Sequence, residues 1–144
     1  EGLLTFVQGN EIYNHTRMAL ESQSGYQNQT QSIINRWRAD GQVTDVPKTV
    51  WGDPMGNSSF SDRWIEDGSY MRLRNASLVY KIPIKGNFIR NASVYVTGNN
   101  LFTLTNYKGY DPEFSVNQAV YSQGIDVTLE PQFRSVLVGV RVGL

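Results

Sequence analysis

Apolar and polar residues alternate most clearly over residues 135–144. One parity carries only branched apolar side chains: Val136, Val138, Val140, Val142 and Leu144. The other parity, apart from Leu137, carries small or polar residues: Ser135, Gly139, Arg141 and Gly143. Because side chains at every second position of a strand share a face, this pattern predicts a strand with one apolar face and one polar face. Its length of about ten residues suits a tilted strand crossing a bilayer better than the strand of about five or six residues that is usual in soluble proteins.

Two further segments alternate in the same way, at residues 70–82 and 92–103. Pro83 ends the first segment, since proline cannot donate to a strand ladder. The connection between the segments, residues 83–91, is short, so together they predict a long hairpin. A fourth strand at residues 3–8 is shorter and less regular in pattern.

Residues 14–68 and 104–132 form two long polar connections. The first contains the signals of one short helix, namely an N-cap, an apolar stripe and a stop: Asn28 or Thr30, then Ile33, Ile34 and Trp37, then Asp40 and Gly41. Alternation of short and long connections is typical of outer-membrane barrels, whose tight turns are periplasmic and whose long loops are extracellular. We therefore expect Gly86 in the periplasm, and Asn57 and Tyr110 outside the cell.

Composition excludes several other classes of protein. The sequence has no run of about 20 apolar residues, which a membrane-spanning helix would need. The 13 Lys and Arg residues balance 13 Asp and Glu residues, so no basic excess favours nucleic acid as a partner. Zero cysteines exclude a disulfide framework, a thiolate metal site and a thiol nucleophile.

Candidate catalytic and metal-binding residues are few. His15 is the only histidine, so the chain has neither a two-histidine metal site nor a Cys/His pair. Five carboxylates fall in two short stretches: Asp62, Glu66 and Asp67, then Asp111 and Glu113. Two of them stand in Asp-Gly or Asp-Pro pairs, which favour turns, and the spacing of a calcium loop is missing. We therefore expect no enzyme activity, no metal and no cofactor.

Several motifs of this chain resemble, in colinear order, those of the SusC/RagA family of TonB-dependent outer-membrane transporters. The longest is DRWIEDGSYMRLRN at residues 62–75. VYVTGNNLFT at residues 94–103, YKGYDPE at residues 107–113 and PQFRS at residues 131–135 follow it. GNEIYN at residues 9–14 and NRW at residues 35–37 are also similar. The resemblance thus covers nearly the whole chain.

The resemblance implies a fold and a place within a larger protein. It implies an all-β segment that supplies the last three to four antiparallel strands of a transmembrane barrel of about 22 strands, with long extracellular loops and one short loop helix. Residues 1–144 would then be a C-terminal fragment without a complete independent domain, which agrees with a chain that opens on Glu1 rather than on Met.

The resemblance also implies a function. The whole transporter would import glycans or peptides across the outer membrane, working with a SusD-like surface lipoprotein. TonB would act through an N-terminal part upstream of Glu1. The expected partners are therefore the SusD-like lipoprotein, TonB, the glycan or peptide cargo and membrane lipid.

Residues expected to contact cargo or the lipoprotein lie in the long loops: Trp51, Tyr107, Tyr110 and Asp111. Aromatic side chains offer a flat apolar face, and loop residues are not needed to close the strand ladder. The alternative is that Asp111 only initiates a turn and that the tyrosines pack against neighbouring loops. Trp64 could instead join an aromatic girdle at the membrane interface.

Arg141 shares its parity with the small and polar residues of the last strand, so we expect it to line the barrel lumen. An arginine facing lipid at the bilayer midplane would cost about 2–4 kcal/mol, whereas in the lumen it would stay hydrated. The four valines of the opposite parity would then face lipid.

A soluble β-sandwich, such as a carbohydrate-binding module, is the main alternative, because it would also show alternating strands and aromatic loops. Only three or four strands are readable, which is too few for two closed sheets and would leave both edges of a single sheet open. Behaviour without detergent distinguishes the two, since a soluble module would be monodisperse.

Overall fold

The computed structural model describes residues 1–84, 88–113 and 124–143 and divides the chain into two compact units. The strand unit comprises Glu1–Asn10, Gly68–Tyr107 and Pro131–Leu144, and the loop unit comprises Glu11–Asp67 and Lys108–Glu130. The expected periplasmic position of Gly86 and the expected place of Leu144 in the last strand concern residues outside the described ones. No helix in the described part of the chain is both long enough and apolar enough to span a membrane.

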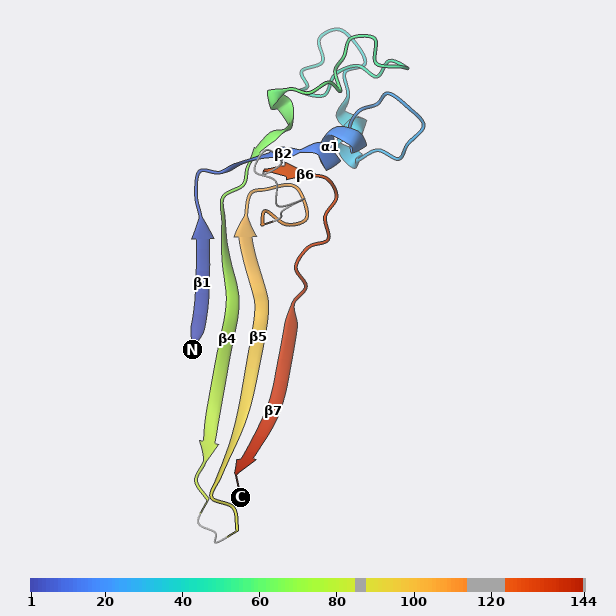
Figure 1. Ribbon diagram of the computed structural model, residues 1–144. Coiled ribbons are helices and arrows are strands. Elements are labelled where there is room, and N and C mark those ends of the chain that lie inside the picture. Colours follow the sequence, from blue (N-terminus) through green and yellow to red (C-terminus); the bar gives the residue numbers. More distant parts are fainter. Residues whose placement is uncertain (85–87, 114–123, 144) are drawn as a thin grey trace. The chain divides into compact units, whose positions relative to one another are not determined.

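The strand unit is a four-stranded antiparallel sheet (Figure 1). Its strands, in spatial order, are β1 (Gly2–Val7), β4 (Tyr70–Ile82), β5 (Asn91–Thr105) and β7 (Ser135–Gly143). The four predicted strands are confirmed, and β5 is longer than its sequence pattern indicated. With 13 and 15 residues, β4 and β5 exceed the roughly 9–11 residues that a tilted strand needs to cross a bilayer.

The register sorts the side chains of this sheet into two faces. Apolar residues form successive rows across β4, β5 and β7: Leu78, Val96 and Val138, then Tyr80, Val94 and Val140. The rows on either side belong to the other face and are more polar: Ser77, Thr97 and Leu137, then Lys81, Ser93 and Arg141. The row between the two apolar rows, Val79, Tyr95 and Gly139, also belongs to that face. Within the described residues Leu78 is 74% exposed and Val138 is 65% exposed. The apolar face of the sheet is therefore uncovered.

A β-bulge at Arg74 keeps the arginines of β4 on the polar face. The pairing of β4 with both β1 and β5 shifts between Leu73 and Asn75, which reverses the parity of the strand beyond this point. Arg72 Nε donates to Thr103 Oγ1 at 3.0 Å, and Arg74 Nε donates to Thr5 Oγ1 at 3.3 Å. The side chains of Arg72 and Arg74 thus lie on the same face.

Tyr95 and Gly139 form a close cross-strand pair on the polar face. A Cβ atom added to Gly139 would lie 2.3 Å from Tyr95 Cζ and 2.4 Å from its hydroxyl oxygen. The tyrosine ring therefore occupies the space that any larger residue at position 139 would need. A larger residue at position 139 would therefore have to displace this ring.

The loop unit contains a second, smaller sheet that the sequence pattern did not predict. Its strands, in the order β3-β2-β6, are Ile65–Asp67, Glu11–Asn14 and Ile125–Asp126. Strand β2 pairs antiparallel with β3 and parallel with β6. Strands of two to four residues are too short to produce a recognisable alternation.

The predicted helix between Asn28 and Gly41 is wrong in extent and type. The structure has only a five-residue 3-10 helix there, η1 (Gln31–Asn35), which begins after Thr30 as N-cap. The chain then turns back, because the Thr44 hydroxyl and the Gln42 amide donate to the Asn35 carbonyl and the Trp37 amide donates to the Val46 carbonyl. The short α-helix α1 lies elsewhere, at His15–Leu20.

Trp64, at the end of the 3-10 helix η2 (Asp62–Trp64), is the largest fully buried side chain among the described residues. Two guanidinium groups lie over its ring, with Arg63 Cζ 4.6 Å and Arg17 Cζ 5.6 Å from the ring centroid. Its indole nitrogen donates to the Ser59 carbonyl at 3.1 Å. An interfacial girdle role for Trp64 is therefore wrong, because the ring is enclosed by the loop unit.

Candidate functional site

Helix α1 positions two charged side chains of the loop unit on one face. The Asn14 side chain accepts a hydrogen bond from the Arg17 amide at 2.8 Å and so caps the helix N-terminus. Arg17 and Glu21 are four residues apart, a spacing that places their side chains side by side on a helix. Arg17 Nε donates to Glu21 Oε1 at 3.2 Å.

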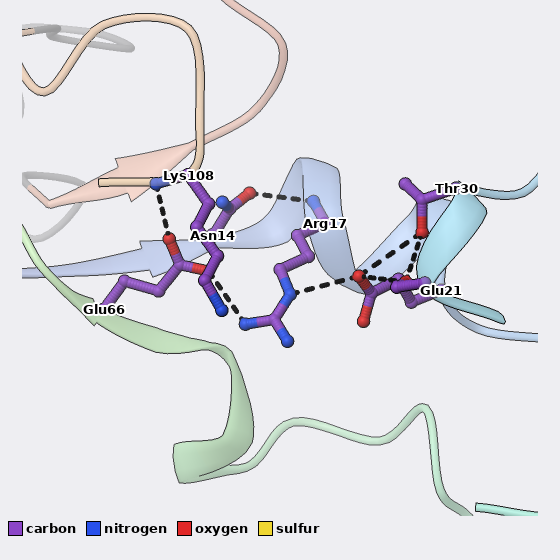
Figure 2. A network of polar contacts seen from close by, with 7 residues as sticks. Asn14, Arg17, Glu21, Thr30, Glu66 and Lys108 are labelled. Carbon is purple, nitrogen blue, oxygen red and sulfur yellow. Dashed lines mark hydrogen bonds and ion pairs between the residues drawn. The ribbon is translucent and has the colours of Figure 1, made fainter. Parts of the chain in front are cut away.

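Arg17 also binds a second carboxylate, from strand β3 (Figure 2). Its Nη1 donates to Glu66 Oε1 at 2.8 Å, and the other oxygen of Glu66 accepts the backbone amide of Lys108 at 3.0 Å. Burial lowers the pKa of Arg17, but hydrogen bonds and charge from Glu66 and Glu21 outweigh burial and raise it. Arg17 thus joins α1 to β3, and Glu66 joins β3 to the segment that begins at Lys108.

Glu21 is buried, with only 6% of its surface exposed. Its Oε1 accepts from Arg17 and from two hydroxyl groups, Ser32 Oγ at 2.8 Å and Thr30 Oγ1 at 3.3 Å. Its Oε2 has no hydrogen-bond partner among the described residues, and no contact is drawn to it in Figure 2. An ionised carboxylate oxygen that is buried without a donor is costly, so this atom is suited to receive one from a ligand.

A cavity of about 280 Å³ adjoins these residues. It is lined from α1, from the start of η1 and from the segment after Tyr107: Asn14, Thr16, Arg17, Leu20, Glu21, Thr30, Lys108, Gly109 and Tyr110. The lining combines two charged groups of α1, several hydroxyl and amide groups and one aromatic ring. Such a mixture can fix the orientation of a small polar ligand.

The structure places the predicted loop residues in two different environments. Trp51 is 61% exposed, with its ring centroid 4.3 Å from that of Tyr26, and Tyr110 is 70% exposed at the cavity. Tyr107 and Asp111 are buried, at 6% and 7% exposed. Asp111 Oδ1 accepts the Glu113 amide at 2.9 Å, as in an Asp-initiated turn. Of the four, Tyr110 is the one that borders the cavity.

A second polar cluster orders the loop that contains Asn57. Asp53 Oδ1 accepts the Asn57 amide at 2.9 Å, and Asp53 Oδ2 accepts the Ser58 amide at 2.8 Å. Burial raises the pKa of Asp53. Hydrogen bonds from the Ser58 hydroxyl and from the Ser58 and Asn57 amides lower it by more, so the net pKa is below its ordinary value. The ionised carboxylate thus stabilises this turn.

On the sheet, Arg141 lies on the polar face in a row with Ser93 and Lys81. The same face carries Arg72 and Arg74, described above, and a row of linked polar side chains. In that row Asn75 Nδ2 donates to Asn99 Oδ1 at 2.9 Å, and Asn99 Nδ2 donates to Ser135 Oγ at 3.1 Å. This arrangement suits a hydrated surface. The lumen-lining role of Arg141 stays a prediction.

Sequence reasoning missed the charged residues that line the cavity, Arg17, Glu21 and Lys108, and weighed Glu66 only as one of a group of carboxylates. The i, i+4 spacing of Arg17 and Glu21 after Asn14 was the available signal, but a six-residue helix is too short to show a periodic apolar stripe. Among residues 1–84, 88–113 and 124–143, no group of three or more His, Cys, Asp or Glu side chains could hold a metal ion.

Comparison with known proteins decides the family. No family model matches the chain. TonB-dependent receptor P3 of Formosa agariphila is 33% identical in an alignment of 142 residues that covers 93% of this chain and 14% of that receptor. TonB-dependent receptor P26 of the same organism is 30% identical over 112 residues, 76% of this chain and 11% of that receptor. The chain therefore spans only a small part of the length of the curated relatives that it matches.

Solved structures agree with the sequence relatives. The RagAB peptide importer in its closed-closed state superposes on 98% of this chain and 15% of its own, with a TM-score of 0.78 and 28% identity. In the open-open state of that importer the TM-score is 0.79, with 26% identity over 99% of this chain and 15% of its own. The chain is a segment of a SusC/RagA-type TonB-dependent receptor.

The all-β, antiparallel fold class and the outer-membrane location are thereby confirmed for this TonB-dependent receptor segment. Its four-stranded sheet corresponds to barrel strands, and the soluble β-sandwich is set aside, because the described sheet exposes its apolar face. The cavity and its charge cluster lie in the loop unit of this receptor segment.

Proposed function

We propose that the protein containing this chain imports glycans or peptides across the outer membrane in a TonB-dependent process, together with a SusD-like lipoprotein. The observation that carries the proposal is the similarity of nearly the whole chain to named TonB-dependent receptors and to the RagAB peptide importer. We propose no catalytic role for these residues, since the relatives are named as receptors and importers.

The two faces of the sheet support a barrel wall. Lipid would contact the apolar rows, and the polar rows with Arg141 would line the hydrated lumen. Energy from TonB would enter through a part of the protein upstream of Glu1. Residues 1–144 would then fold only together with the rest of the barrel. A purified 144-residue chain that is folded and monodisperse without detergent would contradict this last point.

Within the loops, Trp51 and Tyr110 support a contact role best because their rings are exposed. Tyr107 and Asp111, which are buried, would contribute by holding the loop in place rather than through their own surface. The partner contacted by the exposed rings would be cargo or the SusD-like lipoprotein.

Transport is tested in the organism that makes the protein. A deletion strain should fail to grow on one class of oligosaccharide or peptide as its sole nutrient, and the full-length gene should restore growth. Depletion of TonB should block uptake with the receptor still present. Affinity purification of the full-length receptor should recover a SusD-like lipoprotein. Uptake that persists unchanged in the deletion strain for all glycans and peptides would refute the proposed function.

The orientation of the loops is tested separately with epitope tags in the full-length receptor. Tags inserted at Asn57 and Tyr110 should be labelled on intact cells, whereas a tag at Gly86 should be labelled only after the outer membrane is opened. Surface labelling at Gly86 would invert the topology.

A further inference from the structure

We infer that the cavity beside α1 is a binding site for a small zwitterion, such as a free dipeptide, whose ammonium group binds Glu21 and whose carboxylate binds Lys108. The inference deepens the proposed import function by naming a cargo class and the residues that recognise it. It depends on the described residues of the loop unit alone.

Glu21 has one carboxylate oxygen without a partner in the described chain. Three donors converge on Oε1, but Oε2 is buried and has no partner in the described chain. A hydrogen bond to a charged group contributes more than one between neutral groups, so an ammonium is a better partner than a hydroxyl for this atom. Glu21 is one of the residues that line the cavity, so a small turn of its buried carboxylate would present Oε2 to a ligand there.

Negative charge exceeds positive charge in the cluster of Glu21, Glu66 and Arg17. The two carboxylates of Glu21 and Glu66 share one guanidinium, that of Arg17. Among these three side chains one carboxylate charge has no cation of its own, which favours a cationic ligand group beside Glu21. Glu66 uses both oxygens within the described chain, so the available position is at Glu21.

Lys108 lines the same cavity. Its backbone amide is bound to Glu66, but its ammonium forms no ion pair within residues 1–84, 88–113 and 124–143. A ligand that carried only a positive charge would be repelled by this ammonium, whereas a zwitterion would satisfy both groups. The volume of about 280 Å³ is close to the lower limit of about 300–1,000 Å³ for small-molecule pockets, so the ligand must be small.

Calorimetric titration of the purified full-length receptor in detergent tests the site. The probes are L-alanyl-L-alanine, its N-acetyl derivative and its C-terminal amide. The free dipeptide should bind, and each blocked derivative should bind about tenfold more weakly or worse. Glu21→Gln should weaken the free dipeptide and abolish the discrimination against the N-acetyl derivative. Lys108→Met should weaken the free dipeptide and abolish the discrimination against the amide.

Two controls keep the test decisive. Glu130→Gln, which removes an exposed carboxylate outside the cavity lining, should leave binding unchanged. If Glu21→Gln prevents folding, the comparison of acid and amide in Lys108→Met still decides, because the Lys108 contact to Glu66 is made by its backbone. Equal binding of the N-acetyl and free dipeptides, unchanged binding in both variants, or displacement of the dipeptide by a neutral disaccharide would overturn the inference.

Uptake measurements separate this inference from the proposed function. Import that proceeds at the wild-type rate in both cavity variants would overturn the site and leave the transporter standing. A full-length receptor that binds the dipeptide but imports no glycan or peptide would overturn the proposed function and leave the site standing.

Discussion

The two faces of β7 give the most direct test of the barrel assignment. Val138 and Leu137 are adjacent, similar in size and both well exposed, at 65% and 56%, but they point to opposite faces of the sheet. Val138 lies near the middle of the nine-residue strand, where a lipid-facing arginine would be close to the bilayer midplane. Val138→Arg should therefore destabilise the folded barrel by about 2–4 kcal/mol. This loss corresponds to a decrease of about 30- to 900-fold in the folding equilibrium constant.

Leu137→Arg is the matched control, since it places the same charge one residue away on the face that also carries Ser77 and Thr97. A hydrated arginine in the lumen should cost less than about 1 kcal/mol. Reversible urea unfolding of the full-length receptor in lipid vesicles, followed by tryptophan fluorescence, measures both losses. Equal losses for the two variants, or a larger loss for Leu137→Arg, would refute the assignment of lipid and lumen faces.

Three further predictions concern the polar face and the loops. Gly139→Leu should destabilise the receptor by about 1–3 kcal/mol, because the leucine side chain must displace the Tyr95 ring. Adding Tyr95→Ala to Gly139→Leu should recover part of that stability, and strictly additive losses of the two substitutions in urea unfolding would contradict the clash. Since the pKa of Asp53 is held below its ordinary value of 3.8, the stability that Asp53 gives its turn is fully present above pH 3.8 and is lost as the pH falls through the lower pKa of the folded state. Amide-exchange protection of the turn should decrease over that pH range, and Asp53→Asn should remove this pH dependence. Trp51→Ala and Tyr110→Ala should each leave the surface abundance of the receptor normal and reduce cargo uptake; normal uptake, or a loss of uptake matched by a loss of folded barrel, would remove that residue from the contact surface.

The long strands were predictable because alternation over nine or more residues is a strong and local signal. The predicted limits of 70–82 coincide with β4, and the proline at position 83 marked its end correctly. The bulge at Arg74 was not predictable, since nothing in the spacing of Arg72 and Arg74 shows where a ladder takes up an extra residue. Only the register, together with the hydrogen bonds to Thr5 and Thr103, places both arginines on the polar face.

The candidate site was less accessible to sequence reasoning. Exposed aromatic rings in loops could be expected from composition, and Trp51 and Tyr110 are indeed exposed. Burial of Tyr107 and Asp111 depends on how the loop folds back on its surroundings, which no local pattern encodes. The pairing of Arg17 with Glu66 joins residues 49 positions apart, so only the folded chain brings them together.

The loop unit shows why its order escaped the hydrophobic pattern. Its apolar core within the described residues is small, with Ile12, Val46 and Trp64 as its main members. Polar groups are buried beside them: Asn14, Glu21, Gln23, Asp111 and Asp126. Because buried polar groups stabilise a structure only when they are paired, this unit depends on geometry between distant segments rather than on the period of apolar residues. A unit built in this way can leave one acceptor, Glu21 Oε2, unpaired at a cavity, and such an acceptor has a physical reason to be there if a ligand supplies the missing donor.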